Sequence, residues 1–200
     1  MLRKEAAHGD VTKQPAYNAK WEALIPVLKG EIPLKAHAHR CDDMLTAVRI
    51  AKEAGVKITL EHCTEGHLIV DALKAADVPL AVGPTLGHAS KPELVNKSWE
   101  TPGKLAEAGL QVSIITDAPV IPQQYLALCA GLAIKAGMDS FAALQAITIN
   151  PAKHIGIADR VGSLEVGKDA DIVLCDGDPM VSSTVVRKVL VNGVVQVNNG

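Results

Sequence analysis

The chain has 200 residues, of which 48% are apolar and 21% are charged, as is ordinary for one globular domain or slightly more. The formal net charge is −2, and no run of basic residues offers the electrostatic surface that nucleic acids require. No stretch of about 18 uncharged apolar residues is present, so we expect no contact with nucleic acid and no membrane span. The polar amino terminus also lacks the apolar segment of a signal peptide.

The cysteines, at positions 41, 63, 129 and 175, form no Cys-x-x-Cys pair and show no other tight spacing. Disulfide frameworks of small secreted proteins and thiolate metal sites use closer and more regular spacings. We therefore expect reduced thiols and a cytoplasmic protein.

From residue 21 to residue 149, short apolar runs alternate with segments of helical periodicity. The predicted strands are 32–37, 56–62, 78–82 and 110–116. The predicted helices are 21–28, 42–55, 65–76, 101–109, 124–136 and 140–149, the last ending at Asn150-Pro151. Strands that alternate with helices through short loops are typical of βαβ units and a parallel sheet.

The last 40 residues have a different character. A strand is predicted at Ile172–Cys175, and two further apolar runs around Asn192-Gly193 predict a β-hairpin. The expected organisation is a linking or frayed segment, a strand–helix region and a small β portion, over residues 1–20, 21–160 and 161–200.

Side chains that can bind metals follow three of the predicted strands. His37 and His39 stand one residue apart at the end of the first strand, so both leave the same face. His62 ends the second strand, and Asp117 follows the fourth. Because parallel α/β folds place their sites at the carboxyl ends of strands, we expect a single metal-binding pocket there.

Each of these residues also has a structural interpretation. His37 and His62 could be hydrogen-bonded core histidines, and Asp117 could cap a helix. His39 and His88, the latter in the loop after the third strand, could contact the substrate or the metal ligands, or could be ordinary polar loop residues.

Three motifs resemble the amidohydrolase superfamily, in particular its imidazolonepropionase-like and metal-dependent dipeptidase-like members. The first combines KAHAHR with LEHCTEG, and the second is IITDAPVIP. The third, AITINPAKHIGIADRVGSLEVGKDADIVLCDGDP, runs from Ala146 to Pro179 and resembles the family's passage from its barrel into a small β-sandwich. The resemblance covers about residues 20–200.

The resemblance implies a distorted (β/α)8 barrel, of which this chain contains the carboxyl-terminal half and part of the β-sandwich. Barrel strands 5 to 8 are implied at Ile32–His37, Ile58–His62, Pro79–Gly83 and Gln111–Asp117. Family members bind one or two divalent metals. Their ligands are a His-x-His pair on strand 1, a carboxylate or carbamylated lysine on strand 4, histidines on strands 5 and 6, and an aspartate on strand 8.

The implied ligands in this chain are therefore His37, His62 and Asp117, and Asp117 would also transfer the proton. The ligands of strands 1 and 4 have no counterpart. His37-Ala38-His39 cannot be the strand 1 pair, because the interval to Asp117 is too short for seven βα units of about 25 residues each.

We expect zinc, with iron and manganese as alternatives, because imidazole and carboxylate ligands suit all three metals. The predicted function is metal-assisted hydrolysis of a carbon–nitrogen bond in a small cyclic amide, amide or dipeptide-like substrate. Half a barrel would expose sheet edges and apolar interior, so we expect a homo-oligomer or association with a missing half. The alternative function is that of a non-catalytic, self-associating fragment without turnover.

Overall fold

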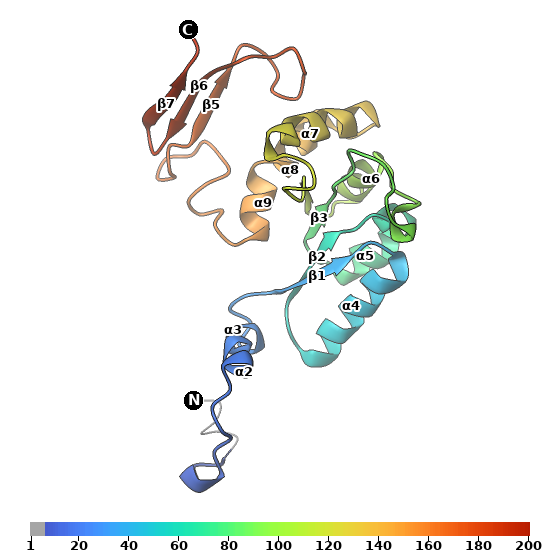
Figure 1. Ribbon diagram of the computed structural model, residues 1–200, viewed down its shortest axis with the longest axis vertical. Helices are drawn as coiled ribbons and strands as arrows, with labels where there is room; N and C mark the ends of the chain where they lie inside the picture. The colour runs from blue at the N-terminus through green and yellow to red at the C-terminus, as the bar shows by residue number, and fades with distance from the viewer. Residues whose placement is uncertain (1–6) are drawn as a thin grey trace.

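The computed structural model describes residues 7–200 (Figure 1). Residues 1–6, part of the predicted linking segment, lie outside the described residues. The segment that follows extends away from the sheets in Figure 1 and contains three short helices, η1 (Val11–Lys13), α2 (Ala19–Ala23) and α3 (Ile25–Leu28). The prediction of one helix over 21–28 is wrong, because Leu24 ends α2 and Pro26, which has no N–H, lies in the first turn of α3.

A parallel sheet of four strands forms the centre of the molecule, and its strands are neighbours in chain order. These strands are β1 (Leu34–Ala38), β2 (Ile58–His62), β3 (Leu80–Val82) and β4 (Val112–Ile114). In register, Ala36 pairs with Leu60, Leu60 with Leu80, and Leu80 with Val112. This arrangement confirms the predicted α/β class with parallel βαβ units.

Of the helices that connect and follow these strands, those over 41–54, 101–107 and 140–146 begin within one residue of a predicted start, whereas those over 92–94 and 149–154 were not predicted. The helices are α4 (Cys41–Ala54), η2 (Gly66–Leu68), α5 (Val70–Ala76), η3 (Pro92–Leu94), α6 (Thr101–Glu107), η4 (Gln123–Tyr125), α7 (Leu126–Lys135), α8 (Ser140–Ala146) and α9 (Ile149–His154). None of the helices within residues 7–200 is long and apolar enough to cross a membrane.

The predicted helix end at Asn150-Pro151 is wrong, because both residues lie in the first turn of α9. A proline is tolerated there, since the first N–H groups of a helix have no partner inside the helix. The side chain of Asn150 donates a hydrogen bond to the carbonyl oxygen of Val112, at 2.9 Å. This contact joins α9 to the start of β4.

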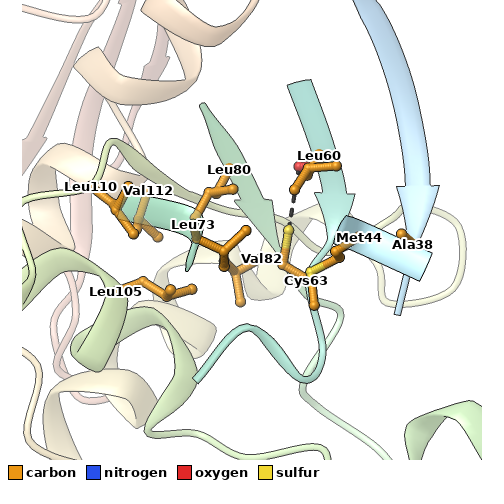
Figure 2. Close-up of a cluster of buried hydrophobic side chains, with 10 residues drawn as sticks. All are labelled: Ala38, Met44, Leu60, Cys63, Leu73, Leu80, Val82, Leu105, Leu110 and Val112. Carbon is orange, nitrogen blue, oxygen red and sulfur yellow. Dashed lines mark hydrogen bonds between the residues drawn. The ribbon is translucent and has the colours of Figure 1, made fainter. Parts of the chain in front are cut away.

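The two faces of the parallel sheet differ in chemistry. Toward α4, α5 and α6 the strands present an apolar surface, and the resulting core appears in Figure 2. Its fully buried side chains include Met44, Leu60, Leu73, Leu80 and Leu105. Since side chains alternate along a strand, the intervening residues project from the opposite face. Those residues are Lys35, His37, Glu61 and Ser113.

The carboxyl-terminal residues form a separate antiparallel sheet of three strands, β5 (Ile172–Cys175), β6 (Val186–Val191) and β7 (Val194–Asn198). Figure 1 shows α7, α8 and α9 between this sheet and the parallel one. Asn192 and Gly193, which join β6 to β7, both have positive φ, as a two-residue hairpin turn requires. The predicted hairpin is therefore confirmed. The division of the chain into residues 1–20, 21–160 and 161–200 stays a prediction.

Candidate active site

The polar face of the parallel sheet borders a pocket of about 440 Å³. His37 from β1, His62 from β2 and Asp117, which follows β4, all line it. The apolar part of its wall consists of Ala81, Ile115, Pro151 and Ile155. The three side chains predicted to converge thus face a common space, at the carboxyl ends of their strands.

An unusual backbone conformation brings His62 into this pocket. In the register of β1 and β2, Glu61 pairs with His37, so both face the pocket and the next residue should face away. His62 instead has a φ of 78°, and Asp117 has a φ of 51°. Positive φ is uncommon for residues other than glycine and occurs preferentially at functional sites. Here it allows consecutive residues, Glu61 and His62, to line one pocket.

Three imidazole rings lie together at this end of the sheet. The candidate ligand atoms of His37, His39 and His62 are all within 4.8 Å of one another. The ring centroids of His37 and His62 are 4.0 Å apart, and those of His39 and His62 are 4.6 Å apart. His39 and His62 are buried, whereas His37 is exposed. Asp117 borders the pocket but is not a member of this cluster.

Hydrogen bonds fix the orientation of the two buried rings. Nδ1 of His62 lies 2.8 Å from the carbonyl oxygen of Gly83. A carbonyl can only accept, so Nδ1 carries the hydrogen and Nε2 keeps its lone pair. Nδ1 of His39 lies 2.7 Å from the hydroxyl of Thr64. Such bonds to the second ring nitrogen are what hold metal-binding histidines in place.

The surroundings favour neutral rings. Although the side chain of His37 is exposed, its partial desolvation, followed by the neighbouring His62, lowers its pKa. Burial lowers the pKa of His39 to about 4, although Glu93 opposes that shift. Neutral imidazole is the form that binds metals. Glu93, whose Oε1 lies 3.7 Å from Nε2 of His39, belongs to η3, a helix absent from the sequence prediction.

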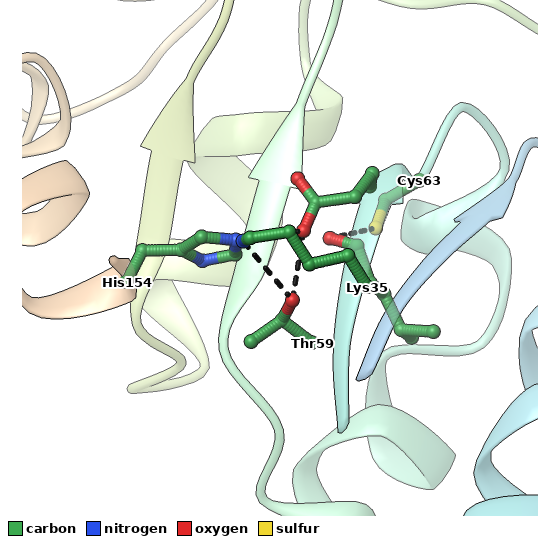
Figure 3. Close-up of polar contacts among 6 residues, drawn as sticks. Lys35, Thr59, Cys63 and His154 are labelled. Atoms are coloured by element: carbon green, nitrogen blue, oxygen red, sulfur yellow. Dashed lines mark hydrogen bonds and ion pairs between the residues drawn. The ribbon is translucent and has the colours of Figure 1, made fainter. Parts of the chain in front are cut away.

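In the same pocket, three donors contact the carboxylate of Glu61. They are Lys35, Thr59 and His154, whose side chains Figure 3 labels. Oε1 of Glu61 lies 3.2 Å from Nζ of Lys35, 2.7 Å from Oγ1 of Thr59 and 2.9 Å from Nε2 of His154. Burial alone would raise the pKa of Glu61, but the hydrogen bonds outweigh it and hold this pKa at about 2. The network was not predicted, because its partners are up to 93 residues apart in the chain.

We expect His154→Ala to reduce the free energy of unfolding by about 1.5–3 kcal/mol, because it removes a hydrogen bond to a largely buried carboxylate. Urea denaturation followed by circular dichroism measures the change. Lys153→Ala, at an exposed neighbouring position of α9, is the matched control and should have little effect. Equal losses in the two variants would contradict a stabilising role for the contact between α9 and β2.

The structure does not bring His88 into the pocket. Its side chain is exposed in the loop between β3 and α6, and its carbonyl oxygen accepts a hydrogen bond from Lys97 at 3.1 Å.

Two buried polar atoms of the pocket lining have no hydrogen-bond partner among the described residues. They are Oγ of Ser113 and Nδ1 of His154.

Residues 24–197 match the family model described as "Amidohydrolase family". The solved structure of an amidohydrolase from Thermotoga maritima MSB8 is similar to the whole chain, with 38% identity and a TM-score of 0.92, and the match covers 52% of that protein. Amidohydrolase tasK of Hapsidospora irregularis is 27% identical over 96% of this chain and 20% of its own length. An adenosine deaminase from Xanthomonas campestris, solved with bound zinc, shares the fold at a TM-score of 0.61 and 19% identity, over 84% of this chain and 46% of that one.

The chain therefore belongs to the amidohydrolase family, as its three motifs indicate, and imidazolonepropionases are among its relatives. A 5-methylthioadenosine/S-adenosylhomocysteine deaminase of Moorella thermoacetica is 29% identical over 80% of this chain and 33% of its own length. It spans about half the length of the Thermotoga maritima protein. The assignment of β1–β4 to barrel strands 5 to 8 stays a prediction.

Proposed function

We propose that this chain supplies half of the active site of a metal-dependent amidohydrolase. Its substrate would be a small cyclic amide, amide or dipeptide-like molecule, and a metal-activated water would attack the carbon–nitrogen bond. One observation carries the proposal, namely that His37, His62 and Asp117 border the same pocket at the carboxyl ends of their strands. Family membership supports the type of bond.

The residues present fit a divalent metal. His62 keeps the lone pair of Nε2 free, and the lowered pKa values of His37 and His39 keep these rings neutral. We propose zinc, which the related Xanthomonas campestris deaminase binds, with iron and manganese as alternatives. When bound, such a metal polarises a carbonyl group and lowers the pKa of water to about 7.

The protein's own groups divide the remaining work. His37 and His62 would hold the metal, and Asp117, which is exposed at the pocket, can receive a proton from water and return it to the leaving nitrogen. Ile115 and Ile155 form an apolar wall that would limit the access of water to the reacting groups. His39 is a further candidate for contact with the substrate, whereas His88 lies outside the pocket.

We also propose that turnover requires a complete barrel. Within residues 7–200, neither β1 nor β4 pairs with a further strand on its outer side, and parallel sheets are normally covered on both faces. The Thermotoga maritima protein contains about as much chain again as the part matched here, and an equivalent half is the partner we propose. If the partner were instead a second copy of this chain, light scattering would give a particle with twice the mass of 21.0 kDa.

The family match gives no support to the alternative of a non-catalytic fragment. All four cysteines are free thiols, which agrees with the cytoplasmic location that we propose.

A chimaera tests the function directly. This chain would replace the matched half of the Thermotoga maritima amidohydrolase, and the product would be assayed on cyclic amides, amides and dipeptides. We expect hydrolysis that falls about 100- to 10,000-fold in Asp117→Asn, the range for loss of a general acid–base group. Asp71→Asn, at an exposed position of α5, is the control and should keep full activity. The proposal would be overturned by a folded chimaera that does not hydrolyse these substrates, or by one whose activity is unchanged in Asp117→Asn.

A further inference from the structure

We infer that the pocket wall around Glu61, Ser113 and His154 is a contact surface for the half of the barrel that this chain lacks. That half inserts a cationic side chain with several N–H donors into the wall. The inference rests on the proposed function, because the partner is the one proposed there for turnover. It concerns a polar contact between the two halves and not the ligands of a metal.

Two buried side chains of this wall lack a partner. Ser113 is 1% exposed and His154 is 6% exposed, and both line the pocket. Oγ of Ser113 and Nδ1 of His154 form no hydrogen bond within residues 7–200. Nε2 of His154 donates to the carboxylate of Glu61, so Nδ1 of the neutral ring is an acceptor. Since a buried polar group without a partner costs stability, we expect donors from another chain segment.

The carboxylate of Glu61 also has an open position. Its three donors all contact Oε1, and Oε2 accepts no hydrogen bond from the part of the chain that the structure describes. The pocket lining carries one cationic side chain, Lys35, and two carboxylates, Glu61 and Asp117. The open positions can therefore all accept, and the surrounding charge is negative. A guanidinium or ammonium group satisfies both conditions.

The strands leave space for such a group. Glu61, Ala81 and Ser113 pair in one row across β2, β3 and β4, and all three line the pocket. Neighbouring strands are about 4.8 Å apart, so roughly 10 Å separates the outer two positions of the row. The residue between them contributes only the methyl group of Ala81. An inserted side chain can lie over this methyl group and reach both neighbours.

The missing half of the barrel is the occupant that the length of the chain indicates. The Thermotoga maritima structure matches the whole chain, yet the match covers only 52% of that protein. The row of Glu61, Ala81 and Ser113 lies on the face opposite the apolar core that α4, α5 and α6 cover. In a closed barrel this face is the interior, where each layer combines side chains from several strands. Side chains of the missing strands can therefore reach the row.

The stability of one variant in two proteins tests the inference. The proteins are the isolated chain and the chimaera in which it replaces the matched half of the Thermotoga maritima amidohydrolase. We expect Ser113→Ala to leave the thermal midpoint of the isolated chain unchanged or raised, because this hydroxyl has no hydrogen bond to lose. In the chimaera the same change should lower the midpoint by about 1–3 °C, because the contact with the inserted side chain is lost.

Glu61→Gln tests the charge of the inserted group, because it keeps the shape and one acceptor oxygen. We expect it to lower the midpoint of the chimaera at least about twice as much as that of the isolated chain, since hydrogen bonds between charged groups are roughly twice as strong as neutral ones. Ser182→Ala, at an exposed position between β5 and β6, is the control and should have the same small effect in both proteins.

Equal shifts for Ser113→Ala in the two proteins, as a trapped water would give, would overturn the inference, and so would equal shifts for Glu61→Gln. If the chimaera hydrolysed its substrates despite such equal shifts, the proposed function would stand without the inference. An inactive chimaera with the expected shifts would overturn the proposed function alone.

A small-molecule surrogate covers the case in which the chimaera does not fold. Methylguanidinium and neutral methylurea have nearly the same shape, and the binding of each to the isolated chain would be followed by the NMR signals of the His154 ring. We expect methylguanidinium to bind about tenfold more tightly, because its donors are charged, and Glu61→Gln to abolish the difference. Equal affinities, or no binding of either compound, would overturn the inference.

Discussion

Gly83→Ala is expected to reduce the free energy of unfolding by about 3 kcal/mol or more, since overpacking costs about 1–3 kcal/mol and a strained backbone adds about 1–3 kcal/mol. A Cβ at this position would overlap the carbonyl oxygen of Ile115, a main-chain atom that cannot rotate away as a side chain could. The φ of Gly83 is 136°, a value that other residues rarely adopt. Relief of the overlap would require β3 and β4 to separate at their carboxyl ends.

Urea denaturation measures this loss, and Gly109→Ala is the matched control. Gly109 also has a positive φ, of 86°, but its Cβ would meet nothing within 4 Å. The difference between the two variants therefore reports the overlap with Ile115, together with the difference in backbone strain between a φ of 136° and one of 86°. If both variants lost the same stability, the close approach of β3 and β4 at the pocket would be contradicted.

His62→Ala is expected to weaken zinc binding by at least about 100-fold, because it would remove a proposed ligand rather than a residue that supports one. The ring of His62 is at the centre of the site, since it is near both other imidazoles and is held by the Gly83 carbonyl oxygen. Competition for zinc between the protein and a chelating dye measures the change in affinity.

His67→Ala is the control for this prediction. His67 is close in sequence, but its ring contacts the hydroxyl of Thr101 at 2.8 Å and it lies outside the histidine cluster. We expect unchanged zinc affinity in this variant. Similar zinc losses in the two variants would mean that zinc binds to exposed histidines in general and not to the pocket.

Much of the fold was predictable from the sequence because its signals are local. Apolar runs such as Val112–Ile114 and the helix ended by Gly55 identify βαβ units, and the turn Asn192-Gly193 identifies the hairpin. The convergence of His37 and His62 follows from the rule that the ends of parallel strands meet at one edge.

The rest depends on tertiary structure that no local pattern reports. Alternation along β2 predicts that Glu61 and His62 face opposite sides, and only the positive φ of His62 brings both to the pocket. The contact of Glu61 with His154 depends on α9, which continues past the helix end predicted at Asn150-Pro151. The burial of His39 requires Thr64 and η3, which are distant in sequence.

The zinc content of the purified chain, measured by elemental analysis after zinc loading and dialysis, tests the central claim most directly. We predict about one tightly held zinc ion per chain, lost when His37 and His62 are both replaced by alanine. A chain that folds with its parallel sheet intact and retains no zinc would contradict the claim that these strand ends form a metal site.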